Sequence, residues 1–248
     1  MPLEAYEAYR RIAALAEYER YLGAFVFGSV ARGDDTGRSD FDLRVVVDEP
    51  NTCRSINHPF VDGVKLDISF ESVEQLRAAT EQEIARRERI PMLAESTIIF
   101  DKTGELGRLK MEALQARPRP FTPDDHQRMQ FLIYHYNNKA ERFLQDDPPA
   151  ALLVMHTGLN DLLQLHYQIH EHWWVSSKRL LQDLRAWDPG LAALVEQFVR
   201  ICEVHAKFAV WSEIVDWILR PMGGRQPIAE NNCSCPTCRH DLGMLAGR

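Results

Sequence analysis

The chain has 248 residues, of which 45% are hydrophobic and 26% charged, and its formal net charge at pH 7 is -7. This balance is typical of a folded globular protein and excludes a disordered or fibrous one. The acidic charge argues against nucleic acid as a partner, because the phosphate backbone attracts a basic surface. No apolar run approaches the about 20 residues that cross a bilayer, and the N-terminus lacks a secretory signal, so we expect a cytoplasmic protein with no membrane partner.

Helical and strand patterns alternate in the first part of the sequence. Apolar residues recur at helical spacing from Leu3 to Tyr21, which predicts an amphipathic first helix. Ser72 and Gln75 have the spacing of a capping box and predict a helix over residues 73–89, and another helix is expected over 105–115. Segments rich in β-branched and aromatic residues predict short strands over residues 23–28, 41–48, 63–70 and 96–101. Between the second and third strands we expect a loop, with a hairpin as the alternative.

After a proline-rich stretch near residue 118, the pattern becomes helical throughout. Thr122 before Pro123 is a strong helix start, and Asp147 before Pro148 repeats the device. The predicted helices, which would form an antiparallel bundle, cover residues 123–144, 148–172, 177–186, 189–205 and 207–219. We therefore expect a mixed α/β domain with a small mixed sheet (α+β class) over residues 1–117, an all-α bundle domain over 118–222, and a tail over 223–248.

Two aspartates one residue apart begin the second predicted strand, in the stretch FGSVARGDDTGRSDFDL. Side chains at positions i and i+2 of a strand point to the same side, so Asp40 and Asp42 project together. Asp67, flanked by apolar residues in VKLDISF, adds a third carboxylate if its strand lies beside the first. Such oxygen ligands suit Mg²⁺, and two ions can clamp the attacking and leaving oxygens of a phosphoryl displacement. We expect a two-magnesium site at these residues.

A glycine and a serine precede the aspartates at the end of the first predicted strand. Gly28 would let the backbone approach a ligand closely, and Ser29 would cap a short helix whose N–H groups bind phosphate. Ser39 adds a hydroxyl group and Arg32 adds a positive charge nearby. The stretch therefore combines candidate polyphosphate and metal ligands.

The stretch GSVARGDDTGRSDFDL resembles the nucleotidyltransferases of the DNA polymerase beta-like superfamily, and the layout of the whole chain is similar to kanamycin and lincosamide nucleotidyltransferases. The resemblance implies transfer of a nucleoside monophosphate from a nucleoside triphosphate, ATP being expected, to a hydroxyl of a small molecule, with release of pyrophosphate. It implies that Gly28 and Ser29 bind the triphosphate. It also implies that Asp40 and Asp42 hold the metals, and that Asp67 holds a metal or the attacking hydroxyl.

Several alternatives stay open at this level. The expected acceptor is an aminoglycoside-like antibiotic, and the resembling enzymes make a homodimer plausible. The base that takes the proton from the acceptor is either Asp67 or a carboxylate of the helical part such as Glu141, Asp161 or Glu171. The competing hypothesis is an antitoxin-like or regulatory protein of the same fold that binds or nucleotidylates a protein partner.

Two further groups of residues have metal-compatible spacing. Four residues near the C-terminus could bind zinc, or else belong to a flexible tail of reduced cysteines: Cys233, Cys235, Cys238 and His240. His166 and His170 are one helical turn apart, and we expect them to line the bundle or its cleft.

Overall fold

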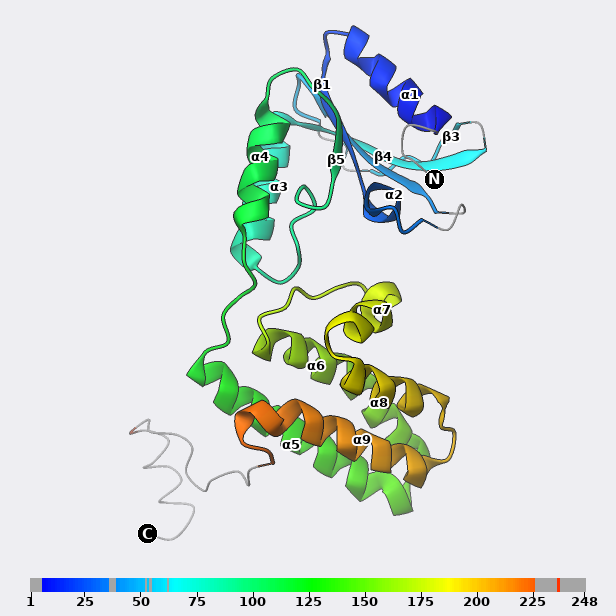
Figure 1. The fold of residues 1–248 in the computed structure, drawn as a ribbon, viewed down its shortest axis with the longest axis vertical. Coiled ribbons are helices and arrows are strands. Elements are labelled where there is room, and N and C mark those ends of the chain that lie inside the picture. Colours follow the sequence, from blue (N-terminus) through cyan, green and yellow to red (C-terminus); the bar gives the residue numbers. More distant parts are fainter. Residues whose placement is uncertain are drawn as a thin grey trace. The chain divides into compact units, whose positions relative to one another are not determined.

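The structure of the chain is a computed structural model that describes residues 6–35, 39–51, 53, 55–61, 63–225 and 236. The chain divides into two compact units, Met1–Arg119 and Pro120–Arg248 (Figure 1). The first unit is mixed α/β and the second is helical, as the sequence predicts. Whether residues 1–117 and 118–222 fold as independent domains stays a prediction, and the four candidate zinc ligands lie outside the described residues.

The first unit is built on a mixed sheet of five strands in the order β3-β4-β2-β1-β5. Strands β2 and β4 run parallel, whereas the other neighbours in the sheet are antiparallel. The short β3 forms a hairpin with β4, which is the alternative expected for this segment. The strands are β1 (Tyr21–Phe27), β2 (Phe41–Val47), β3 (Phe60–Val61), β4 (Val64–Ser72) and β5 (Thr97–Asp101).

Helices cover both faces of this sheet because its central strands alternate between two apolar layers. On one face, Phe41 and Leu43 of β2 pack in a cluster with Ile12 of α1. On the other face, Phe25 and Val46 pack with residues of two helices that follow β4 and β5 (Figure 1). The helices of this unit are α1 (Glu7–Ala13), continued by the 3-10 turn η2 (Ala14–Glu17), α2 (Gly28–Arg32), α3 (Val73–Arg86) and α4 (Glu105–Gln115).

Two predicted helix boundaries in this unit are wrong, and each has a local cause. The first helix ends at Ala13, because Tyr21, counted with the helix in the sequence analysis, pairs with Val47 in the sheet. Helix α3 begins at the predicted capping box but stops at Arg86, because Arg87 adopts a left-handed conformation with φ of 56°. Tertiary pairing and backbone geometry thus override the helical pattern at these ends.

In the described part of the second unit, the helices are α5 (Pro123–Asp146), α6 (Pro148–Ile169), α7 (Ser177–Trp187), α8 (Pro189–Arg200) and α9 (Val204–Leu219), followed by the short η3 (Arg220–Met222). The predicted caps are confirmed: Thr122 forms a capping box at α5, and Asp147 accepts a hydrogen bond from Ala150 N at α6. Helix α8 ends five residues earlier than predicted, and α9 begins three residues earlier than predicted. Among the described residues, no helix combines the length and the apolarity needed to cross a bilayer.

His166 lies in the core of this unit, as the sequence predicts for the bundle histidines. Its side chain is 1% exposed and stacks on Trp187 with 5.0 Å between ring centroids. Its Nε2 lies 2.9 Å from Oδ2 of Asp188, so Nε2–H donates to the carboxylate, and buried Nδ1 is left without a hydrogen-bond partner among the described residues. Burial, assisted by the charge of His170, lowers the pKa of His166 to about 4, although Asp188 opposes the shift.

This buried histidine should make the helical unit sensitive to acid. Between pH 6.5 and about 4 the unfolded chain binds a proton at His166 that the folded chain does not, so stability falls as the pH falls. The loss at pH 4 should reach about 3 kcal/mol at most. Denaturant unfolding at pH 7.5, 5.5 and 4.5 should show a weaker pH dependence in His166→Gln than in the wild type or in the exposed control His135→Gln. Equal slopes in all three proteins would contradict this assignment.

Candidate functional site

Two of the predicted site residues are direct neighbours in the sheet. Asp42 of β2 and Asp67 of β4 are paired in the parallel register, and because paired residues project to the same side, both carboxylates lie on one face. Asp42 alternates with the buried residues Phe41 and Leu43, so this face is the one on which α3 and α4 pack. The sequence expectation that the two strands lie side by side is confirmed for this pair.

Gly28 leaves room for the Asp42 carboxylate. Its φ of 73° lies in the left-handed region, and a Cβ added at this position would overlap Oδ2 of Asp42. Phe27, the last residue of β1, is paired with Asp42 in the sheet, which fixes this approach. A glycine is therefore required here for two reasons, its backbone conformation and its closeness to a carboxylate.

The expected cap of α2 is wrong. Phe27 is the N-cap residue, Gly28 and Ser29 are the first two helical residues, and no side chain caps the helix. Ser29 lies two positions past the N-cap position, so its hydroxyl is not placed to accept hydrogen bonds from the free N–H groups of the first turn. Arg32 is engaged with two carboxylates, since its Nε donates to Asp34 Oδ2 at 3.2 Å and its Nη1 lies 3.6 Å from Glu95 Oε2.

Asp40 is brought to Asp67 by a residue that the sequence analysis missed. Nζ of Lys65 lies 2.9 Å from Oδ2 of Asp40 and 3.0 Å from Oδ1 of Asp67. Nδ1 of His58 lies 2.6 Å from the same Asp67 oxygen. Ser39 directly precedes Asp40 in the sequence, and its side chain is half-buried. The position between the two carboxylates thus already holds a positive charge.

These contacts set the ionisation of the site. Burial acts to raise the pKa of Asp67, but the hydrogen bonds from His58 and Lys65 outweigh it, so the pKa is lowered. The same carboxylates raise the pKa of Lys65, with the hydrogen bond to Asp40 as the largest cause. At neutral pH the cluster therefore contains the charged Lys65 ammonium beside the charged Asp67 carboxylate.

The side chains of this cluster have the chemistry of a divalent-cation site. Carboxylate oxygens are the ligands that Mg²⁺ prefers, and the Lys65 ammonium is a stand-in cation between Asp40 and Asp67. As the side chains lie, no three His, Cys, Asp or Glu residues of the described part of the chain are grouped so that they could hold a metal ion. The chemistry fits the metal, and a cation binding between these two carboxylates would have to replace Lys65.

One sequence signal could have found Lys65, whereas His58 gave none. Lys65 precedes Asp67 by two residues on a strand, so alternation alone places the two side chains on one side. His58 approaches through an isolated bridge between Asn57 and Ile68, a contact that no local pattern encodes. The alternative bases Glu141, Asp161 and Glu171 belong to the second unit, where Asp161 Oδ2 accepts from the Tyr136 hydroxyl at 3.1 Å.

Comparison with known proteins supports the resemblance to the polymerase beta-like superfamily, whereas the similarity to kanamycin and lincosamide nucleotidyltransferases stays a prediction. The family model for "Polymerase beta, Nucleotidyltransferase" matches residues 11–92, which contain β1, α2, β2 and β4. A nucleotidyltransferase-like protein from Exiguobacterium sibiricum 255-15 is 17% identical over 86% of this chain and 72% of its own, with a TM-score of 0.45. None of the curated proteins matches. The family match, which falls on the strands that carry the aspartates, supports nucleotidyl transfer as the chemistry of the first unit.

Proposed function

We propose that this protein transfers a nucleoside monophosphate, AMP in the first instance, from a nucleoside triphosphate to a hydroxyl of a small molecule. The observation that carries the proposal is the pairing of Asp42 with Asp67 on one face of the sheet, beside Gly28 and inside the family match. An aminoglycoside-like antibiotic is the acceptor proposed, because an acidic protein attracts a polycation. Magnesium is the cofactor proposed.

Each residue has a role in this reaction. The acceptor oxygen forms a bond to the α-phosphorus, the bond from that phosphorus to the bridging oxygen breaks, and pyrophosphate leaves. Asp40, Asp42 and Asp67 would hold the magnesium ions, which supply charge neutralisation when bound. Backbone N–H groups at Gly28 and Ser29 would contact the triphosphate. Asp67, charged at neutral pH, would orient the acceptor hydroxyl and accept its proton.

The proposal is tested by a screen of acceptors against labelled triphosphates. Purified protein with Mg²⁺ is incubated with each of the four triphosphates and panels of aminoglycosides, other hydroxylated small molecules and proteins. The expected result is an acceptor whose mass rises by one nucleoside monophosphate while pyrophosphate appears in equal amount. Labelling of a protein and of no small molecule would instead favour the regulatory alternative.

Lys65 should compete with the metal. Because its ammonium lies between Asp40 and Asp67, Lys65→Met should strengthen Mg²⁺ binding to the nucleotide-free protein several-fold. Titration calorimetry, or the electron paramagnetic resonance of Mn²⁺ used as a probe, measures this without any turnover. Lys139→Met, on the exposed side of α5, changes the net charge equally and should leave the metal affinity unchanged. Weaker metal binding in Lys65→Met would show that the ammonium supports the site.

A further inference from the structure

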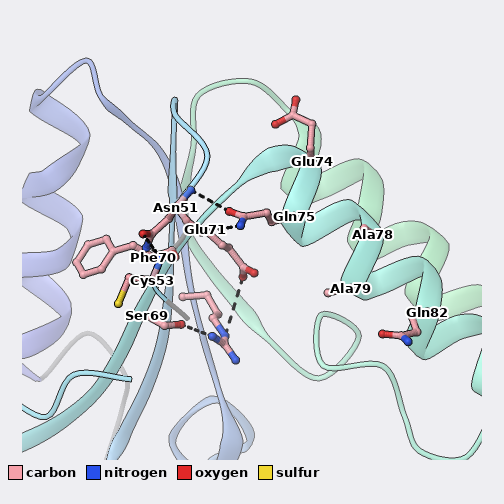
Figure 2. A pocket seen from close by; sticks show the side chains of 11 residues that line it. Asn51, Cys53, Ser69, Phe70, Glu71, Glu74, Gln75, Ala78, Ala79 and Gln82 are labelled. Carbon is pink, nitrogen blue, oxygen red and sulfur yellow. Dashed lines mark hydrogen bonds and ion pairs between the residues drawn. The ribbon is translucent and has the colours of Figure 1, made fainter. Parts of the chain in front are cut away.

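A second site lies on the same sheet, next to the carboxylates. A pocket of about 530 Å³ opens between the surface of β2 and β4 and helix α3 (Figure 2). Arg44 and Ser69 line it and are paired in the parallel register, two residues further along each strand from Asp42 and Asp67. Side chains two residues apart on a strand share a face and are separated by about 7 Å. The pocket therefore lies next to the carboxylate cluster along the two strands, although none of the three aspartates lines it.

The pocket contains a charged pair whose hydrogen bonds are incomplete. Nε of Arg44 and Oε1 of Glu71 are 4.0 Å apart, and neither buried atom has a hydrogen-bond partner among the described residues. The guanidinium is held in place by one hydrogen bond, from Nη1 to Ser69 Oγ, and by the ring of Phe27. Burial raises the pKa of Glu71, although Arg44 opposes the shift. A donor and an acceptor thus lie side by side without the partners that such groups normally have.

The wall of the pocket is fixed before any ligand binds. Asn51 lies in the loop after β2. Its backbone N–H donates to Gln75 Oε1 at 3.2 Å, and its backbone carbonyl oxygen accepts from Gln75 Nε2 at 2.7 Å (Figure 2). Asn51 Nδ2 also donates to the Phe70 oxygen at 2.7 Å. On the α3 side, Ala78 and Ala79 contribute only methyl groups, which leaves space above the sheet. The volume and the fixed rim are those of a small-molecule site.

We propose that this pocket binds the edge of a nucleobase, with the Arg44 guanidinium donating to a ring nitrogen or carbonyl and Glu71 accepting from the adjacent N–H. All four bases carry an acceptor and a donor on neighbouring atoms of their pairing edge. The inference rests on the proposed function in so far as a nucleotide is the ligand expected at this sheet.

The charges favour a neutral edge over the amino groups of an aminoglycoside. The charges of Arg44 and Glu71 sum to zero, the third charged lining residue, Glu74, is exposed to solvent, and the partly buried Arg44 guanidinium repels an ammonium placed against Glu71. A neutral group that carries both an acceptor and a donor can pair with the exposed atoms of the Arg44 guanidinium and the Glu71 carboxylate without adding charge, since the two side chains are 27% and 17% exposed. Hydrogen bonds to charged groups are stronger than those between neutral groups. The base whose edge best matches Arg44 and Glu71 should therefore bind with a measurably higher affinity than the other bases.

Nucleosides test this site without the phosphates and the metal. Titration of the full chain with adenosine, guanosine, cytidine and uridine, followed by NMR, should show saturable binding of at least one of them. Arg44→Met and Glu71→Gln should each weaken that binding about tenfold or more. Ala79→Leu, which fills the space but keeps both charged groups, should also block it. The control Glu74→Gln, an exposed residue that lines the same pocket, should change the affinity less than about twofold.

The base can belong to the donor or to the acceptor, and triphosphate binding separates the two sources. If the pocket binds the base of the triphosphate that donates the nucleoside monophosphate, Arg44→Met should equalise the affinities of the four triphosphates. If it binds the base of an acceptor molecule, the order of the four triphosphate affinities should stay the same in Arg44→Met. Binding of kanamycin in the pocket with no nucleoside binding would overturn the proposal, as would nucleoside affinities unchanged in Arg44→Met and Ala79→Leu. Asp42→Asn should leave nucleoside binding intact, so a failure of the transfer reaction and a failure of this site are distinguishable.

Discussion

Replacement of Asp42 by asparagine is expected to lower the rate of nucleotidyl transfer about a thousandfold or more, because the amide keeps the shape and removes the charge that would hold magnesium. A loss of this size corresponds to about 4 kcal/mol of transition-state stabilisation. The fold should be unaffected, since Asp42 is partly exposed and its backbone pairing with Asp67 does not involve the carboxylate. The measurement is adduct formation with the acceptor found by screening, together with the thermal unfolding temperature.

The matched control is Asp48→Asn. Asp42 lies at the start of β2, whereas Asp48 directly follows the end of this strand and is exposed. Asp48→Asn therefore removes the same charge from the same segment, but away from the carboxylate cluster. It should retain the wild-type rate. Wild-type activity in Asp42→Asn would remove Asp42 from the reaction and refute the metal role given to it.

Replacement of Gly28 by alanine is expected to remove most of the activity and to destabilise the first unit. The new Cβ would overlap Oδ2 of Asp42, so either the carboxylate or the start of α2 must shift. The left-handed φ of 73° adds a backbone cost of about 1–3 kcal/mol for a side-chain-bearing residue. Misplacement of a metal ligand by about 1 Å can cost about a hundredfold in rate.

Gly33 provides a control for the backbone cost alone. Its φ is 74°, nearly the same as at Gly28, yet a Cβ added there meets nothing within 4 Å. Gly33→Ala should therefore lose only the backbone cost of about 1–3 kcal/mol in denaturant unfolding, less than Gly28→Ala loses, and should keep its transfer rate. Equal activity losses in the two variants would show that the carboxylate contact of Gly28 has no special importance.

The elements with local signals were predicted from the sequence. The Ser72–Gln75 capping box predicted the start of α3, Thr122 before Pro123 predicted the start of α5, and α4 was predicted with both ends correct. These motifs need only residues three positions apart, so no tertiary information is required. The ends of α1, α6 and α8 were missed, because the helical pattern continues past the point where the backbone turns away.

The carboxylates of the site were predictable, and their partners were largely not. Alternation of apolar and acidic residues identified Asp42 and Asp67, and their register follows from the parallel pairing of two apolar strands. The contact of Lys65 with Asp40 joins residues 25 positions apart, and the contact of Arg44 with Glu71 joins residues of two strands. Such contacts depend on which strands become neighbours, so the sequence alone offered no spacing by which to recognise them.

The central claim is that the aspartates on this face of the sheet bind divalent cations that carry the phosphates of a nucleotide. Isothermal titration calorimetry of ATP into the wild-type protein, once with Mg²⁺ and once with a chelator, tests it without knowledge of the acceptor. Mg²⁺ should strengthen ATP binding about tenfold or more, and Asp42→Asn should abolish this gain. The same ATP affinity with and without Mg²⁺ in the wild-type protein would contradict it.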